Sequence, residues 1–305
     1  MTSSPSFVLV TGATGQQGGA VVRTLLASGV AVHTLVRDTG SERAAALGGL
    51  GATLVRGDFD DTASLKAAAD GARAVFSVQP PDVTGDSEVR HGRNLVEAAR
   101  AAEVEQFVHT SVSGAGTVDT ENFDEERWGP APRHYNWSKA GVENHVRTAG
   151  FPHWTILRPA AFMENFVRPS FYFADMTSDR LFVAVDLDVR LPYVAVGDVA
   201  TAAAAAFAEP RRFHGVELEL AGDILTFRDA ARTLSRVLAT DIQLPGSPDQ
   251  VRAEGLDPLV FQLQRYTSAH PAPARPEFAA DLGLPTTTFE DWAETLADAG
   301  NFVRR

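Results

Sequence analysis

The chain has 305 residues, 44% of them hydrophobic and 22% charged, which is typical of a globular protein with one large α/β domain or a core domain plus a smaller one. Its net charge of −12 and the lack of any basic cluster argue against direct binding to nucleic acid. The absence of cysteine excludes disulfides, thiolate metal sites and a cysteine nucleophile, and we predict no metal site. The first residues lack the basic and the long apolar segment of a signal peptide, and no apolar run reaches about 18 residues, so we expect a cytoplasmic protein that does not contact membranes.

The first part of the chain alternates short apolar runs with helical segments. The predicted strands are residues 7–12, 31–37, 52–58, 72–79 and 105–113. The predicted helices between them are residues 18–29, 41–51, 62–71 and 88–104, with Gly29 as a helix stop and Thr62 as a helix cap. This alternation with short connections predicts an α/β fold with a doubly wound parallel sheet and helices on both faces.

The second part of the chain is less regular. Residues 114–133 are polar and rich in Gly and Pro, so we expect a loop over a site. Further predicted elements are a helix at 134–150, strands at 153–159 and 216–222, a strand and an alanine-rich helix within 191–210, and helices at 227–239 and 288–300. We expect residues 1–160 to form the core domain. Residues 161–305 would form a smaller substrate-side lobe, interleaved with the core by a core strand and helix near 192–208.

Three glycines, Gly12, Gly15 and Gly18, lie between the first predicted strand and the first predicted helix. A glycine turn at that place lets the backbone approach a ligand, and the following helix offers free N–H groups and the positive end of its dipole. The pyrophosphate of a dinucleotide fits there, with Gln16 and Gln17 contributing backbone N–H groups. The alternative is a turn with a purely structural role.

The end of the second predicted strand bears on cofactor choice. NAD sites usually carry an acidic residue there, but this chain has Arg37, 19 residues after Gly18, and Asp38 comes one residue later. An arginine can pair with a 2′-phosphate, so we predict NADP(H) in preference to NAD(H). The alternative is a solvated arginine at a strand end. Asp58 and Phe59 follow the third strand, where they could flank an adenine ring or lie in a solvated loop that ends with Asp61 or Thr62 as helix cap.

The fourth predicted strand ends in the segment SVQPP, residues 77–81. This segment lies level with the expected central ribose of the cofactor. We therefore place Val78 and Gln79 among the cofactor-binding residues. His109, inside the fifth predicted strand, is interpreted as a packed residue.

Several segments carry a family resemblance: TGATGQQGG, VRD, GDFDD, SKAGVENHVRTAGFPHWTILRPAAFMENF and VGDVATAAAAAF. They resemble the NmrA-like branch of the atypical short-chain dehydrogenase/reductase superfamily over nearly the whole chain. The resemblance implies a Rossmann core, a small C-terminal lobe and NADP(H) binding. That family includes quinone and related reductases, and also redox-sensing regulators that bind the cofactor without turning it over.

The resemblance also assigns roles to individual residues. It implies cofactor contacts for Gly12, Thr14, Gly15, Gly18, Arg37, Asp58 and Phe59. It assigns Lys139 to the nicotinamide ribose, and it places Phe162 and Asn165 near the nicotinamide.

Tyr135 and Lys139 form the Tyr-x-x-x-Lys pair of short-chain dehydrogenases, on one face of a predicted helix. In that arrangement the lysine lowers the pKa of the tyrosine, which then passes a proton, while a serine such as Ser111 or Ser113 holds the substrate oxygen. Lys139 is one of only two lysines beside 25 arginines. The alternative is that Lys139 only binds ribose and Tyr135 only packs.

Two functions therefore remain open. The first is an NADPH-dependent reductase of a small apolar carbonyl compound, enone or quinone, with aromatic residues at 162–173 lining either a substrate pocket or plain core. The second is a non-catalytic NADP(H) sensor that acts through a protein partner. Either protein could form a homodimer.

Overall fold

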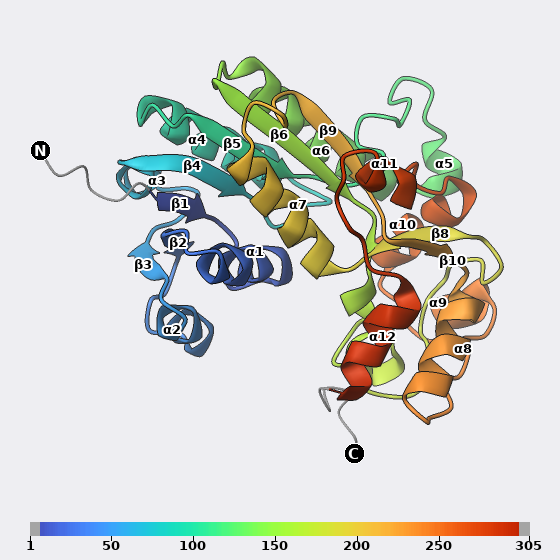
Figure 1. The fold of residues 1–305 in the computed structure, drawn as a ribbon. Coiled ribbons are helices and arrows are strands. Elements are labelled where there is room, and N and C mark those ends of the chain that lie inside the picture. Colours follow the sequence, from blue (N-terminus) through green and yellow to red (C-terminus); the bar gives the residue numbers. More distant parts are fainter. Residues whose placement is uncertain (1–6, 299–305) are drawn as a thin grey trace, which may run out of the picture. The chain divides into compact units, whose positions relative to one another are not determined.

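The computed structural model describes residues 7–298, and these residues divide into two compact units (Figure 1). The first unit comprises Met1–Gly116, Tyr135–Arg158 and Val199–Leu218. The second comprises Thr117–His134, Pro159–Asp198 and Glu219–Arg305. None of the helices formed by residues 7–298 has the length and apolar composition that a membrane span requires.

A seven-stranded sheet with the order β3-β2-β1-β4-β5-β6-β9 organises the first unit. Its strands are β1 (Phe7–Val10), β2 (Val32–Val36), β3 (Thr53–Arg56), β4 (Ala72–Ser77), β5 (Gln106–Thr110), β6 (His153–Pro159) and β9 (Val216–Leu220). Neighbouring strands from β3 to β6 pair in parallel. The predicted doubly wound, Rossmann-like parallel sheet is therefore confirmed.

Helices cover both faces of this sheet (Figure 1). They are α1 (Gln16–Ala27), α2 (Glu42–Gly49), α3 (Thr62–Ala69), α4 (Ser87–Ala101), α6 (Ala131–Thr148) and α7 (Val196–Ala208). Fully buried Leu9, Leu65, Leu95 and Phe107 belong to the core cluster between strands and helices. Because the parallel strands end at one edge, the segments that follow β1 to β5 meet there, and that edge carries the candidate site.

Local signals set several helix ends in the first unit. Gly29 has a φ of +74° just after α1, a left-handed conformation that favours glycine, so it ends the helix as predicted. Of the two residues offered as cap of α3, Asp61 is the N-cap and Thr62 is not. The Asp61 carboxylate accepts hydrogen bonds from the N–H groups of Ala63 and Ser64.

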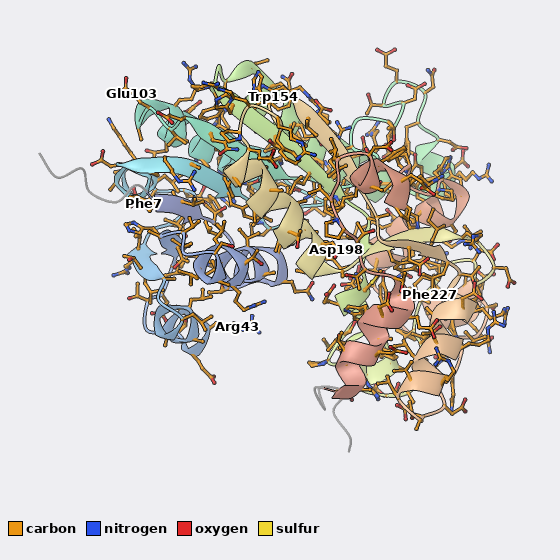
Figure 2. All side chains as sticks on the ribbon, viewed as in Figure 1. Phe7, Arg43, Glu103, Trp154, Asp198 and Phe227 are labelled. Carbon is orange, nitrogen blue, oxygen red and sulfur yellow. The ribbon has the colours of Figure 1, made fainter. Side chains whose placement is uncertain are left out.

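The second unit contains a three-stranded sheet, β10-β8-β7, and short helices. Its strands are β7 (Ala161–Phe162), β8 (Leu191–Val194) and β10 (Asp223–Leu225). Its helices are α5 (Glu125–Trp128), α8 (Phe227–Val237), α9 (Pro248–Ala253), α10 (Pro258–Ala269), α11 (Pro276–Ala280), α12 (Phe289–Asp298) and the short 3₁₀ turns Met163–Phe166 and Ala174–Met176. Phe166, Tyr193 and Phe289 form its aromatic core with Phe227, which lies at the start of α8 (Figure 2).

The structure corrects three expectations about the second half. The strand expected in the core near residue 192 is β8, which pairs with β7 and β10 in the small sheet because its partners lie in the second unit. The expected loop at 114–133 contains α5, and α6 begins at Ala131. Helices α9, α10 and α11 were not predicted. The last residues of the helix expected at 288–300 lie outside the described residues.

Candidate cofactor site

The glycine turn joins β1 to α1 at the edge where the parallel strands end. Gly12 has a φ of +60°, and its carbonyl accepts a hydrogen bond from the N–H of Gly15 at 2.9 Å. Thr11 ties the turn to the end of β4, because its Oγ1 accepts from the N–H of Val78 at 3.0 Å. Helix α1 begins at Gln16 with Gly15 as N-cap, and no side chain among the described residues caps it. The N–H groups of its first turn are therefore available to an anion.

The three glycines serve different purposes. A Cβ at Gly12 would lie 2.4 Å from Val78 Cγ1, and one at Gly18 would lie 2.4 Å from the Gly12 carbonyl oxygen, so the protein's own packing requires both. A Cβ at Gly15 would meet one atom, that same oxygen, at 3.2 Å, and Gly15 has the extended φ of −95° that any residue adopts. A contact of 3.2 Å is tight and needs a shift of a few tenths of an ångström, so the fold constrains Gly15 less than it constrains Gly12 and Gly18.

The other turn residues lie at the mouth of the site. Thr14, Gly15 and Gln16 are exposed. Gln17 has a side-chain role that its sequence position does not reveal: its Oε1 accepts a hydrogen bond from Thr110 Oγ1 at 2.6 Å. That bond joins the start of α1 to the end of β5.

A pocket of about 390 Å³ lies at the ends of β2 and β3. It is lined by Arg37, Arg56, Gly57, Asp58, Asp61 and Ser64. Both guanidinium groups are exposed, and within residues 7–298 neither has an ion-pair partner. The two carboxylates are engaged: Asp58 accepts from the N–H of Asp60 at 2.9 Å, and Asp61 caps α3.

Arg56 was not among the predicted site residues. Its signal in the sequence is its place at the end of the third strand, which corresponds to the place of Arg37 at the end of the second. Asp38 does not line the pocket, and its carboxylate instead accepts from the N–H of Gly40 at 2.8 Å.

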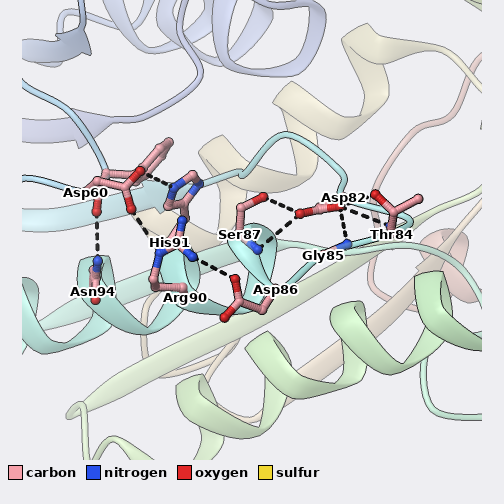
Figure 3. A network of polar contacts seen from close by, with 10 residues as sticks. Asp60, Asp82, Thr84, Gly85, Asp86, Ser87, Arg90, His91 and Asn94 are labelled. Carbon is pink, nitrogen blue, oxygen red and sulfur yellow. Dashed lines mark hydrogen bonds and ion pairs between the residues drawn. The ribbon is translucent and has the colours of Figure 1, made fainter.

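Two contacts hold Phe59 against α4. Its ring stacks on His91 with 5.3 Å between ring centres, and its carbonyl accepts from Asn94 at 2.8 Å. Asp60 next to it pairs with Arg90 and His91 (Figure 3). These contacts fix the loop after β3, and the adenine contact of Phe59 stays a prediction.

Val78 and Gln79 follow β4, as expected. Val78 packs toward Gly12, while the buried Gln79 donates from Nε2 to Ser77 Oγ at 2.9 Å. Ser77 Oγ in turn lies 3.2 Å from His109 Nδ1. His109 is buried, as predicted for a packed residue, and burial together with the charge of Lys139 lowers its pKa to about 3. Its imidazole is therefore neutral at physiological pH.

Tyr135 and Lys139 lie on α6, four residues apart, with the Lys139 Nζ 5.3 Å from the centre of the Tyr135 ring. The sequence did not reveal a third member of this cluster. Glu88 of α4 is buried, and its Oε1 lies 2.6 Å from the Lys139 Nζ. The ammonium therefore has an internal carboxylate partner as well as its aromatic neighbour.

The electrostatics correct the expectation that Lys139 gives Tyr135 a low pKa. Burial raises the pKa of Tyr135, Lys139 opposes that effect, Glu88 adds to it, and the net direction is upward. Burial lowers the pKa of Lys139, but Tyr135 and Glu88 outweigh it, so its pKa is also raised. At neutral pH the cluster therefore holds a protonated tyrosine beside the ion pair of Lys139 and Glu88, which has no net charge.

The two predicted serines follow β5 and are both buried. The N–H of Ser111 donates to the Leu157 carbonyl at 2.7 Å. Its Oγ is buried and has no hydrogen-bond partner within residues 7–298. Among those residues, no group of carboxylate or imidazole side chains is arranged to hold a metal ion.

Phe162 and Asn165 belong to the second unit. Phe162 ends β7 and is half-buried. Asn165 forms a side-chain hydrogen bond with Tyr172, whose pKa burial raises to about 12. Of the neighbouring aromatic residues, Phe166 and Phe173 are buried in the core, while Phe171 is exposed.

Comparison with known proteins gives consistent matches. The model of the NmrA-like family matches residues 4–265. The NmrA-like family domain-containing oxidoreductase malD of Malbranchea aurantiaca is 29% identical over 252 residues, which cover 74% of this chain and 71% of malD.

Two solved structures share the fold. The NADPH-dependent quinone oxidoreductase QOR2 of Escherichia coli, complexed with NADPH, has a TM-score of 0.72 and 23% identity and covers 95% of this chain and 99% of its own. The negative transcriptional regulator NmrA, in complex with NAD, has a TM-score of 0.70 and 20% identity and covers 98% of this chain and 97% of its own. One of these proteins is a reductase and the other a regulator.

Proposed function

The chain belongs to the NmrA-like family, and from that premise we propose that it binds NADP(H) and reduces a small apolar carbonyl compound, enone or quinone. Its relative malD is named an oxidoreductase, and QOR2 is a quinone reductase that binds NADPH. Two places in the first unit support such a role: the pocket at the ends of β2 and β3, and the cluster of Tyr135, Lys139 and Glu88.

One observation carries the cofactor proposal: Arg37 and Arg56 share a pocket, and neither has an ion-pair partner within residues 7–298. A 2′-phosphate is an anion that guanidinium groups bind through charge-assisted hydrogen bonds. Asp38, the residue that could hold a ribose hydroxyl instead, is bonded to Gly40. The pocket therefore favours NADP(H) over NAD(H).

The glycine turn fits the pyrophosphate of the same cofactor. Its helix lacks a side-chain cap among the described residues, so its first N–H groups can bind phosphate oxygens. Gly15 is exposed, and the fold constrains it less than Gly12 and Gly18. We infer that the absence of a side chain at Gly15 serves the ligand.

The cofactor, when bound, would supply hydride. In this proposal Lys139 orients Tyr135 and holds the ribose, Tyr135 Oη gives a proton to the substrate oxygen, and the unpartnered Ser111 Oγ donates a hydrogen bond to that oxygen. Ser113, close by in the chain, is the other candidate for that hydrogen bond. The raised pKa of Tyr135 keeps its proton in place until the substrate oxygen becomes more basic than a phenolate.

That raised pKa bears on the substrate class. Hydride transfer to a ketone or aldehyde makes an alkoxide, which is basic enough to take a proton from Tyr135. Hydride transfer to a quinone makes a phenolate-like oxygen, whose conjugate acid resembles a tyrosine with a pKa near about 10. We therefore expect quinones and other conjugated acceptors to depend least on Tyr135.

The same cluster supports a second candidate function. Glu88 neutralises Lys139, and Tyr135 is a weaker acid than a free tyrosine. A chain with these properties could bind NADP(H) without turnover and signal its redox state through a protein partner or a second copy of itself. NmrA is a regulator of the same fold.

The oxidation of NADPH, followed by absorbance at 340 nm, distinguishes the two. The reductase proposal predicts that a quinone, an enone or an aldehyde accelerates the loss of absorbance. Tight binding of NADPH with no acceleration by any of the three classes would contradict the reductase and favour the sensor.

A further inference from the structure

The side chain of Asn136, which directly follows Tyr135 on α6, is bonded through both its oxygen and its nitrogen to the turn after β5. Its Oδ1 accepts a hydrogen bond from the N–H of Gly116 at 2.9 Å, and its Nδ2 donates to the carbonyl of Gly114 at 3.0 Å. Asn136 is 9% exposed, and Gly114 is buried. Hydrogen bonds in such a position compete with little water, so they fix the groups that they join.

Backbone bonds and two glycines give the turn its shape. The N–H of Ala115 donates to the carbonyl of Val112 at 3.1 Å, which closes a β-turn around Gly114. Gly114 and Gly116 have φ of +79° and +78°, values that favour glycine. A Cβ at Gly116 would meet the Cβ of Ala140 at 3.9 Å, an ordinary van der Waals distance. The turn therefore lies against α6, and the amide fixes the register between them.

These bonds lie where the chain leaves the first unit and where it returns. One segment of that unit ends at Gly116 and the next begins at Tyr135, while residues 117–134 belong to the second unit. The start of α6, residues 131–134, is part of that excursion. Tyr135 is therefore the first residue of its segment, and the amide of Asn136 joins the two ends of the excursion within the first unit.

Tyr135 lies beside this anchor but on another face of the helix. Consecutive residues of an α-helix point about 100° apart, so the face bonded to the turn differs from the face that carries Tyr135 and Lys139. About one turn further on, the ion pair of Lys139 with Glu88 joins the helix to α4. The helix is therefore held from two elements, and Asn136 supplies the bonds to the sheet edge where β5 ends.

We propose that Asn136 is a positioning residue of the proposed reductase, whose two bonds hold Tyr135 at the place from which its Oη gives a proton to the substrate oxygen. The inference rests on the proposed function, because it concerns the proton donor of that reaction. A reacting group displaced by about 1 Å can lose a hundredfold in rate. Acceptors that need the proton of Tyr135 should therefore depend on Asn136. An anchor that only stabilises the fold would affect all acceptors alike.

The first test compares an aldehyde with a quinone in Asn136→Leu, which removes both bonds at similar side-chain volume. Turnover of the aldehyde should fall about tenfold to a hundredfold, because its alkoxide needs the proton of Tyr135. Turnover of the quinone and the affinity for NADPH should each fall less than about threefold. Asn144→Leu makes the same change at an exposed position of α6 and should leave both rates within about twofold.

A double variant separates positioning from general damage. In the Tyr135→Phe background the proton donor is absent, so Asn136→Leu should lower the aldehyde rate by less than about threefold. Damage to the fold would lower that rate by the same factor in both backgrounds. Asn136→Asp keeps the acceptor for Gly116 and loses the donor for Gly114, so it serves where Asn136→Leu does not fold. It should show the same difference between the two acceptors.

The failure of this inference and the failure of the proposed function give different results. Equal losses with the aldehyde and the quinone, an unreduced aldehyde rate in Asn136→Leu, or the same loss in the Tyr135→Phe background would each overturn the inference and leave the reductase intact. A protein that reduces no acceptor, or whose turnover Tyr135→Phe does not lower, would overturn the proposed role of Tyr135 and this inference with it.

Discussion

The two ends of the candidate cofactor site in the first unit differ in whether their cationic side chains have an acidic partner within the protein. At the ends of β2 and β3, Arg37 and Arg56 are exposed and have no ion-pair partner within residues 7–298. Near the middle of α6, Lys139 is buried, with its Nζ 2.6 Å from a Glu88 oxygen. The end with Arg37 and Arg56 presents cations to a ligand, and we call it the open end. The end with Lys139 and Glu88 has its cation neutralised inside the protein, and we call it the closed end.

Because of this difference, we expect one end to determine the affinity for the cofactor and the other to take part in proton transfer. An exposed guanidinium can pair with a phosphate without giving up a protein partner, so ligand affinity is expected to come from the arginine end and the glycine turn. A buried ion pair contributes little net stability, but removing one partner leaves an uncompensated charge. The ion pair at the closed end is therefore expected to fix the position of Tyr135, and substitution of either partner is expected to destabilise the protein.

The largest expected effect lies at the closed end. If Tyr135 gives a proton to an alkoxide, Tyr135→Phe should lower the turnover of an aldehyde by roughly 10² to 10⁴ while NADPH binding stays nearly unchanged. Turnover of a quinone should fall less than about tenfold, because a phenolate-like product needs little acid help. Steady-state rates with both acceptors and calorimetric titration of NADPH check this. An aldehyde rate equal to that of the wild type would remove Tyr135 from the chemistry.

The second largest effect is expected when the buried ion pair of Lys139 and Glu88 is broken. Lys139→Ala should lower the free energy of unfolding by about 3–5 kcal/mol, because Glu88 is left buried without its counter-charge. Denaturant unfolding measures this change. Lys66→Ala, at the only other lysine of the chain and in an exposed position, is the control and should stay within about 0.5 kcal/mol.

A second substitution tests whether the loss of stability comes from the unpaired charge of Glu88. Glu88→Gln in the Lys139→Ala background removes the unpaired charge and should recover part of the lost stability. If the single variant unfolds with wild-type stability, the ion pair is not buried as the structure has it.

At the open end, Gly15→Val should weaken NADPH binding by roughly a hundredfold, about 2.7 kcal/mol, because a branched side chain would occupy the space of the pyrophosphate. Its free energy of unfolding should fall less than that of Gly18→Ala, since Gly15 has an extended backbone and its Cβ would lie 3.2 Å from the Gly12 carbonyl oxygen. Gly18→Ala is the contrasting control. Its Cβ would meet the Gly12 carbonyl oxygen at 2.4 Å, so it should destabilise the fold. Normal NADPH binding by Gly15→Val would make the turn purely structural.

The smallest effect, taken per pH unit, is the pH dependence of stability at the closed end. The pKa of His109 is lowered to about 3 from the ordinary value of 6.5, by burial and by Lys139. Between those values the unfolded chain binds a proton that the folded chain does not, so stability falls as the pH falls through this window. The slope from this group approaches about 1.4 kcal/mol per pH unit.

His109→Leu removes that contribution. The stability of the variant should therefore depend less steeply on pH between about 4 and 6 than that of the wild type, while the two slopes should agree above about pH 7. Denaturant unfolding at a series of pH values measures both. Parallel curves throughout would show that His109 does not titrate as its burial requires.

Much of the first unit could be predicted because its signals are local. Alternating apolar runs and glycine-ended helices predict the parallel sheet, and the spacing of Gly12, Gly15 and Gly18 places the turn after β1. Arg37 follows its strand directly. Each of these features depends on neighbouring residues and not on a distant partner.

The remaining features depend on tertiary pairing. Glu88 lies on α4 and Lys139 on α6, and no local pattern joins them, so the neutralised ammonium and the raised pKa of Tyr135 could not be foreseen. Strand β8 is a short apolar run that does not reveal which sheet it joins. The bonds from Asn136 to the turn after β5 likewise emerge only once α6 lies against that turn.

We propose that the open end of the first unit binds the 2′-phosphate of NADP(H) through Arg37 and Arg56. The decisive experiment is calorimetric titration of NADPH and NADH against the wild type and the Arg37→Ala/Arg56→Ala double variant. One charge-assisted pair contributes about 1.5–3 kcal/mol, so the wild type should bind NADPH roughly tenfold to a hundredfold or more tighter than NADH. The double variant should bind the two alike, with its NADH affinity near that of the wild type. Equal affinities of the wild type for NADPH and NADH would show that the two arginines do not bind a 2′-phosphate.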